Sequence, residues 1–181
     1  MTYLKVSIGI FLILCVTRLI PHPPNFTSLQ ALSFYVPAIL GIRYLPVLLL
    51  SFIFTDLFLG FHGVILFTWG SIVFIGLLSQ FFKLTVVKRL SGALIGVCFF
   101  FIITNFGVWT LGSYGYTFQG LILCYTLAIP FFGNALIATF IISFLIEIIY
   151  KIKKVRWVSK KIKISLILIL IFIKMNYLKS K

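Results

Sequence analysis

Six residues of this largely apolar chain carry side chains suited to recognising a small molecule. They are Arg18, Asn25, Asp56, Asn105, Trp109 and Asn134. Two of them are charged, three are amides that donate and accept hydrogen bonds, and one is an indole with a single donor and a large apolar face. Charged residues within apolar segments are costly in a membrane and usually have a role, so this set predicts a ligand-binding site.

Each of these polar side chains also has a structural interpretation, and both interpretations stay open. Arg18 and Asp56 either pair with each other or contact a ligand, and a free Arg18 would favour an anionic ligand group. Asp56 is also a candidate proton or cation site. Asn25 follows two prolines and is typical of a turn or helix cap, while Asn105 and Asn134 are candidates for hydrogen bonds between helices.

The sequence contains no catalytic signature. It has no GxSxG, no Walker loop and no HExxH, and its only acidic residues are Asp56 and Glu147. The sequence therefore offers very few carboxylates for general acid–base catalysis. His22 and His62, together with Asp56, are an alternative metal site, but no HxxxH or HxxE spacing supports it. We predict that the protein is not an enzyme and has neither a cofactor nor a metal site.

The composition predicts a helical membrane protein. Hydrophobic residues make up 62% of the 181 residues, charged residues make up 10%, and the mean hydropathy is +1.21. A water-soluble domain needs far more polar surface. The net charge of +14 does not indicate nucleic-acid binding, because the basic residues lie at the ends of apolar segments. The expected fold is all-α, with about six transmembrane helices in one bundle.

The apolar runs define the expected helices and two domains. The predicted spans are residues 3–20, 31–42, 44–59, 64–82, 92–109 and 118–150. We expect the first to be retained, because no cleavage site follows it, and Pro130 to kink or divide the last. Residues 1–150 would form the bundle and residues 151–181 a basic tail. Residues 164–173 of that tail are too few to span a membrane, which favours an interfacial segment that contacts membrane lipids.

The distribution of basic residues predicts the orientation of the bundle. With six spans, Arg43, the basic loop at 83–89 and the C-terminal tail share one side with the N-terminus. The connections at 21–28, 60–63 and 110–117 carry no charged residue. The positive-inside rule therefore predicts cytoplasmic termini.

The uncharged connections also predict where a site would lie. They emerge on the outer side, near the ends of the helices that carry Arg18, Asp56 and Asn105. The stretch from Asn105 to Asn134 is rich in aromatic residues and glycine, and irregular polar sequence at membrane depth normally lines a cavity. Trp109 and the nearby tyrosines, 114 and 116, are equally typical of an aromatic belt at the membrane interface.

Four motifs resemble an uncharacterised family of bacterial inner-membrane proteins. They are RLIPHPPNF at 18–26, TDLFLG at 55–60, NFGVW at 105–109 and GLILCYTLAIPFFGN at 120–134. That family is grouped with the S components of energy-coupling factor (ECF) vitamin transporters. The resemblance implies a six-helix bundle in the bacterial inner membrane with a ligand pocket near the outer face. It also implies a coupling membrane subunit and ATPases as partners.

The resemblance and the residues together give two functional hypotheses. The first is a substrate-binding transport subunit for a small vitamin-like or metabolite ligand. The resemblance implies the same six residues as its ligand contacts. S components usually dock the coupling subunit through an A-x-x-x-A pair on the first helix, and VSIGIFLILCVT at 6–17 has no such pair. The alternative is a structural or assembly membrane protein without a small-molecule substrate.

Overall fold

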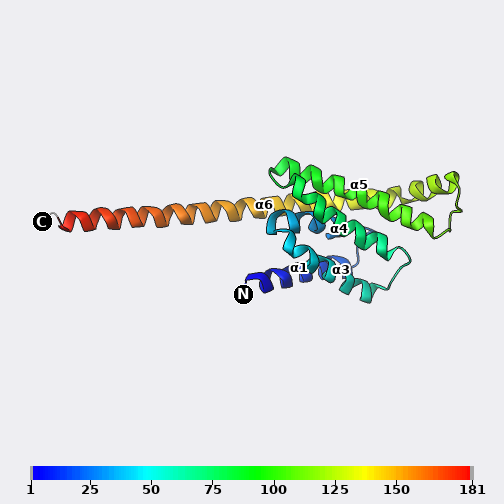
Figure 1. Ribbon diagram of the computed structural model, residues 1–181, viewed down its shortest axis with the longest axis horizontal. Helices are drawn as coiled ribbons and strands as arrows, with labels where there is room; N and C mark the ends of the chain where they lie inside the picture. Colours follow the sequence, from blue (N-terminus) through cyan, green and yellow to red (C-terminus); the bar gives the residue numbers. More distant parts are fainter. Residues whose placement is uncertain (1, 180–181) are drawn as a thin grey trace. The chain divides into compact units, whose positions relative to one another are not determined.

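The computed structural model is an all-helical chain (Figure 1). It describes the backbone of residues 2–179 and the side chains of residues 3–153. The α-helices of this part are α1 (Thr2–Leu19), α2 (Leu29–Tyr35), α3 (Leu45–Leu59), α4 (Ile65–Phe82), α5 (Val86–Thr110) and α6 (Phe118–Lys179). This agrees with the predicted all-α bundle. The fifth helix begins six residues earlier than expected, because the Thr85 side chain accepts a hydrogen bond from Lys88 N at 3.2 Å and caps the helix.

The chain divides into two compact units within α6. Met1–Phe144 forms the first unit and Leu145–Lys181 the second. Helix α6 is continuous through Pro130, so the proline does not divide it as was considered from the sequence. Membrane helices tolerate proline because neighbouring groups satisfy the freed carbonyl. The interfacial segment predicted at 164–173 lies outside the residues whose side chains are described.

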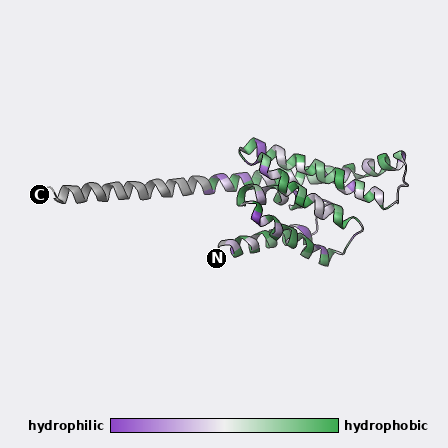
Figure 2. Ribbon diagram, in the orientation of Figure 1, coloured by the Kyte–Doolittle hydropathy of each residue, from purple (hydrophilic) through white to green (hydrophobic). Residues whose placement is uncertain are grey.

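The outer surface of the described helices is apolar, as a membrane protein requires. Four segments are long and apolar enough to cross a membrane: Ile42–Leu59, Ile65–Phe82, Val86–Thr110 and Phe118–Lys153. Large side chains point outward from them, for example Leu66 at 75% exposure and Phe81 at 79%. Figure 2 shows that hydrophobic residues predominate along these helices. Water-soluble monomers rarely expose apolar surface on this scale, whereas lipid covers it readily.

Helix α2 is short and lies inside the bundle. Together with the π-helical turn Val36–Leu40 it forms an apolar helical segment, Leu29–Leu40. At 1.5 Å per residue this segment is about 18 Å long, well short of the ~30 Å hydrocarbon core. All seven residues of α2 are buried, and it contacts α3, α4 and α5. The second predicted span is therefore a helix of roughly half the membrane thickness that other helices surround.

Glycines on α5 permit close packing against α2 and α4. A Cβ atom at Gly92 would lie 2.6 Å from the Phe34 ring, and one at Gly96 would lie 3.1 Å from Ile75. These are the two glycines of the G-x-x-x-G spacing in α5. The first part of α6 lies along the same helix, since Tyr125 Oη donates to Ile102 O at 2.6 Å. Helix α5 therefore contacts α2, α4 and the first part of α6.

Candidate functional site

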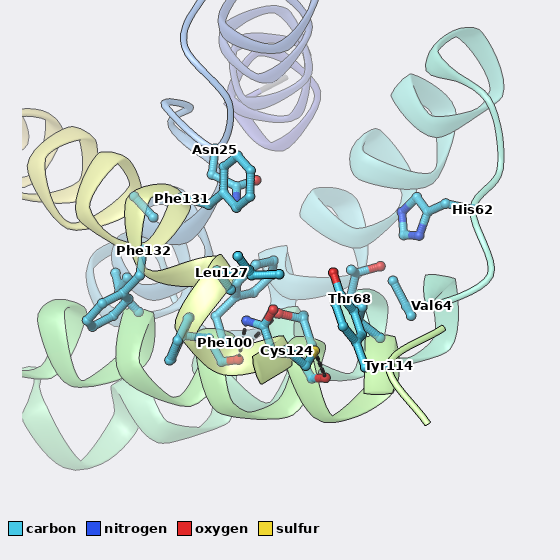
Figure 3. Close-up of a pocket in the computed structure, with 17 residues that line it drawn as sticks. Asn25, His62, Val64, Thr68, Phe100, Tyr114, Cys124, Leu127, Phe131 and Phe132 are labelled. Atoms are coloured by element: carbon cyan, nitrogen blue, oxygen red, sulfur yellow. Dashed lines mark hydrogen bonds between the residues drawn. The ribbon is translucent and has the colours of Figure 1, made fainter. Parts of the chain in front are cut away.

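A cavity of about 350 Å³ lies between α5, the first part of α6 and three connecting segments (Figure 3). Its helical walls are one face of α5, between Val97 and Val108, and one face of α6, between Cys124 and Ala135. On both helices the lining residues recur at steps of three and four, which is the spacing of a single helix face. The cavity volume is at the lower end of the ~300–1,000 Å³ typical of small-molecule sites.

Each of the three connections without a charged residue contributes one polar side chain to this cavity. Asn25 comes from the α1–α2 connection, His62 from the α3–α4 connection and Tyr114 from the α5–α6 connection. None of the three side chains has a hydrogen-bond partner among residues 3–153. Figure 3 shows the His62 ring and Tyr114 on the side of the cavity away from Phe131 and Phe132. The three groups are therefore available to a ligand.

The proline-rich turn holds Asn25 in place. Proline cannot continue α1, and Phe26 N closes a turn by donating to Pro23 O at 2.9 Å. Asn25 has φ 61°, a left-handed conformation that asparagine tolerates better than most residues. Asn134 Nδ2 of α6 donates to Pro24 O at 3.0 Å. The backbone beside Asn25 is thus tied to the helix that forms one wall of the cavity.

A hydrogen bond and a close backbone approach hold Tyr114. Trp109 Nε1 donates to Gly115 O at 3.0 Å, which ties the end of α5 to the loop. Gly115 itself has φ 73°, a left-handed conformation that glycine adopts without steric cost because it has no Cβ atom. Gly120, in the first turn of α6, packs so tightly against the loop that a Cβ there would clash with the carbonyl oxygens of Tyr114 and Gly115. The start of α6 therefore positions the tyrosine.

The surrounding helices α4, α5 and α6 supply four further polar groups. Thr68, Thr104 and Cys124 are buried, and Asn105 is partly buried. The two threonine hydroxyls donate to carbonyls of their own helices, at 2.9 Å and 2.7 Å. Asn105 Nδ2 donates to Phe101 O at 2.8 Å, and Cys124 Sγ donates to Asn105 O at 3.4 Å. With its amide nitrogen engaged, Asn105 keeps its side-chain oxygen as an acceptor.

Aromatic rings form much of the remaining wall. Phe100 and Phe101 come from α5, and Phe131 and Phe132 from α6. The rings of Phe101 and Phe132 pack together with their centroids 4.6 Å apart. A wall of this kind favours a ligand with a flat apolar face, because aromatic rings pack against one another in offset or edge-on arrangements.

Arg18 and Asp56 pair with each other and do not line the cavity. Arg18 Nη1 lies 2.8 Å from Asp56 Oδ1, and it also donates to Thr55 Oγ1 and, at 3.3 Å, to Phe52 O. Trp69 Nε1 donates to Asp56 Oδ2 at 2.8 Å. The Arg18 guanidinium also lies over the Phe52 ring, 4.3 Å from its centroid. Of the two interpretations, the structure supports pairing, so Arg18 gives no reason to expect an anionic ligand.

The structure separates the six predicted site residues into three groups. Asn25 and Asn105 line the cavity. Trp109 and Asn134 lie outside its lining and hold the segments that carry Tyr114 and Asn25. The remaining two, at positions 18 and 56, form the ion pair.

Sequence reasoning did not assign several lining residues to the site. The sequence presents His62 only as a candidate metal ligand. Tyr114 lies in the stretch 105–134 that is expected to line a cavity, but it is equally typical of an aromatic belt. Thr68, Thr104 and Cys124 are small polar residues within apolar helices, and only the helix-face spacing on α5 and α6 gives a signal for the last two. Within residues 3–153, no three His, Cys, Asp or Glu side chains form a potential metal site.

Comparisons with known proteins place the chain in one family. Neither the curated proteins nor the solved structures contain a match to it. A family model does match, over residues 2–162, which is most of the chain. The protein therefore belongs to the family of unknown function DUF6580.

Proposed function

We propose that this protein captures a small molecule in the cavity and serves as the substrate-binding subunit of a membrane transporter. One observation carries the proposal. Three connections far apart in the sequence each direct one unpartnered polar side chain, from Asn25, His62 and Tyr114, to the same cavity. A largely apolar pocket with a few convergent polar groups is the usual form of a small-molecule site.

The assignment to transport rests on the sequence. The motifs that resemble the bacterial inner-membrane family grouped with ECF S components supply two of the lining residues, Asn25 and Asn105. They also supply the tethers Trp109 and Asn134. Because the sequence has no Walker loop, energy for transport would come from a coupling membrane subunit and ATPases as partners, or from a gradient. We propose no chemical step and no cofactor, since the described lining contains no carboxylate and the sequence carries no catalytic motif.

The proposed location is the cytoplasmic membrane of a bacterium, with both termini in the cytoplasm. The support is the distribution of charge. Arg43 lies in the α2–α3 connection, and the basic residues at 83–89 lie in the α4–α5 connection and the first turn of α5. The connections that reach the cavity are uncharged. In this orientation the cavity belongs to the outer half of the bundle, where a substrate-capture subunit meets its ligand.

Native mass spectrometry of protein purified in mild detergent tests the proposal. We expect the wild type to carry a small-molecule adduct, or to gain one from a panel of metabolites. The variants Asn25→Ala and Tyr114→Phe should reduce adduct occupancy at least tenfold, because each removes one hydrogen-bonding group from the site. Thermal unfolding of the same samples reports whether the variants remain folded.

Ser113→Ala is the matched control. Ser113 is exposed, lies next to Tyr114 and does not line the cavity. Its variant should keep the wild-type adduct. Failure of the wild type to bind any member of the panel, or equal occupancy in the folded Tyr114→Phe and Asn25→Ala variants, would contradict capture at this site.

A structural or assembly role is the second candidate. It is favoured by the contacts that fix helix geometry without facing the cavity, namely the Arg18–Asp56 ion pair and the Asn134–Pro24 hydrogen bond. The same spectra distinguish the two functions. A stable complex with another membrane protein and no small-molecule adduct would favour assembly.

A further inference from the structure

We infer that the ligand of this cavity is an uncharged, planar ring compound of roughly a dozen non-hydrogen atoms. The inference rests on the proposed function, because it concerns the same site. It adds the chemical class of the ligand, which follows from three properties of the cavity: the absence of charge, the position of the free hydrogen-bonding groups and the aromatic walls.

The described lining of the cavity provides no permanently charged side chain as a partner for an ion. Its lining contains no Lys, Arg, Asp or Glu within the described part of the chain. The charged pair on the neighbouring helices is internally neutral, with Arg18 and Asp56 2.8 Å apart and the second carboxylate oxygen occupied by Trp69. An ionic ligand would leave water without gaining a partner charge, which is strongly unfavourable. A neutral ligand avoids this cost.

The free polar groups suit a neutral ligand that both donates and accepts hydrogen bonds. The Asn25 amide, the His62 ring and the Tyr114 hydroxyl each combine donor and acceptor capacity. The side-chain oxygen of Asn105 adds an acceptor from the helical wall. An amide, a lactam or a heterocycle with ring N–H groups satisfies such a set without carrying charge.

The walls and the volume set the shape of the ligand. Four phenylalanines from α5 and α6 line the cavity, and two of them pack 4.6 Å apart. A flat ring makes the largest contact with such rings. A volume of about 350 Å³ corresponds to roughly a dozen water-sized groups at ~30 Å³ each. The cavity therefore accommodates one or two fused or linked rings.

Matched probes of equal shape test this inference. Benzamide, benzoate and benzamidine are planar and nearly isosteric, and at neutral pH they are uncharged, anionic and cationic; nicotinamide and nicotinate form a second pair. Binding to the full-length protein in nanodiscs would be measured by saturation-transfer NMR, with dissociation constants from titration. We expect each amide to bind at least tenfold more tightly than its charged counterparts.

A variant that introduces charge sharpens the test. His62 is exposed at the cavity, so His62→Asp should fold and should shift the preference towards benzamidine at least tenfold. Gln119→Glu adds the same charge at an exposed position outside the lining and should leave the preference unchanged.

The outcomes separate this inference from the proposed function. Equal or tighter binding of benzoate or benzamidine to the wild type would overturn the neutral ligand and leave small-molecule capture standing. No binding of any probe would overturn the planar ligand class. In that case an adduct in the native mass spectrum would preserve the proposed function, and its absence would remove both.

Discussion

Arg18 and Asp56 join the last turn of α1 to the last turn of α3 through an ion pair of 2.8 Å. The carboxylate is 1% exposed and the guanidinium side chain 13%. Such a pair contributes little net stability compared with apolar residues of the same size, but removing one partner leaves a buried charge uncompensated. The pair therefore specifies how these helices meet.

The first prediction concerns this ion pair. Arg18→Met should destabilise the bundle by about 3–5 kcal/mol, because the buried Asp56 would lose its ion-pair partner. Thermal unfolding in detergent measures the effect. The double variant Arg18→Met with Asp56→Leu should recover most of the loss. If Arg18→Met instead abolished ligand binding with unchanged stability, Arg18 would be a ligand contact.

The second prediction concerns the indole that completes the pair. Trp69→Phe removes the donor to Asp56 Oδ2 and leaves that oxygen buried without its partner. The expected cost is about 1–3 kcal/mol. In the background of Asp56→Leu the same substitution should cost much less, since the acceptor is already gone. A double-mutant cycle on thermal stability isolates this coupling, and additive effects would contradict it.

The third prediction concerns the tether on the proline-rich turn. Asn134→Ala removes the hydrogen bond to Pro24 O. We expect a stability loss of only about 1 kcal/mol but a clear loss of ligand affinity, because Asn25 is no longer held at the cavity. Titration with the ligand found by native mass spectrometry measures the affinity.

Thr126→Ala is the control for this variant. Among residues 3–153 its hydroxyl bonds only to Ile122 O of the same helix, so ligand affinity should not change. Equal affinity in Asn134→Ala and the wild type would show that the turn keeps its position without the tether.

The fourth prediction concerns the close approach at the start of α6. Gly120→Ala would force the Tyr114 carbonyl away from the helix and displace the tyrosine. Ligand affinity should decrease because the loop that carries Tyr114 is displaced. Amide hydrogen exchange should increase around residue 114. Gly133→Ala is the matched control, because a Cβ there meets nothing within 4 Å. This control should keep binding and gain up to about 1 kcal/mol in stability from helix propensity.

The helices could be predicted from the sequence more fully than the site. Long apolar runs and charged ends predict α3 and α4 to within a residue or so, because membrane insertion depends on length and hydropathy. Hydropathy predicts a short span at α2, since it does not distinguish a helix covered by lipid from one covered by protein. Its buried polar residues, Gln30 and Ser33, were the available signal.

The site was predictable only at the level of which segments converge. Topology places the uncharged connections at one end of the bundle, and Asn25 and Asn105, which this topology singles out, line the cavity. The prediction of Arg18 and Asp56 as ligand contacts rested on their charge. A sequence does not reveal whether two opposite charges pair with each other, as these two do in the structure. His62 and Tyr114 were ambiguous for a similar reason, since burial and free hydrogen-bonding capacity depend on packing.

The enclosed helix α2 also has a consequence for how the chain is made. Leu29–Leu40 is too short to be inserted as a span by itself, and the buried Gln30 Oε1 has no hydrogen-bond partner in the described residues. Its neighbours α4 and α5 are synthesised later than α2. During biosynthesis this segment therefore packs into its final position only after α5, which ends at residue 110, has left the ribosome. Nascent chains truncated before α5 should leave α2 open to proteolysis, and longer ones should protect it.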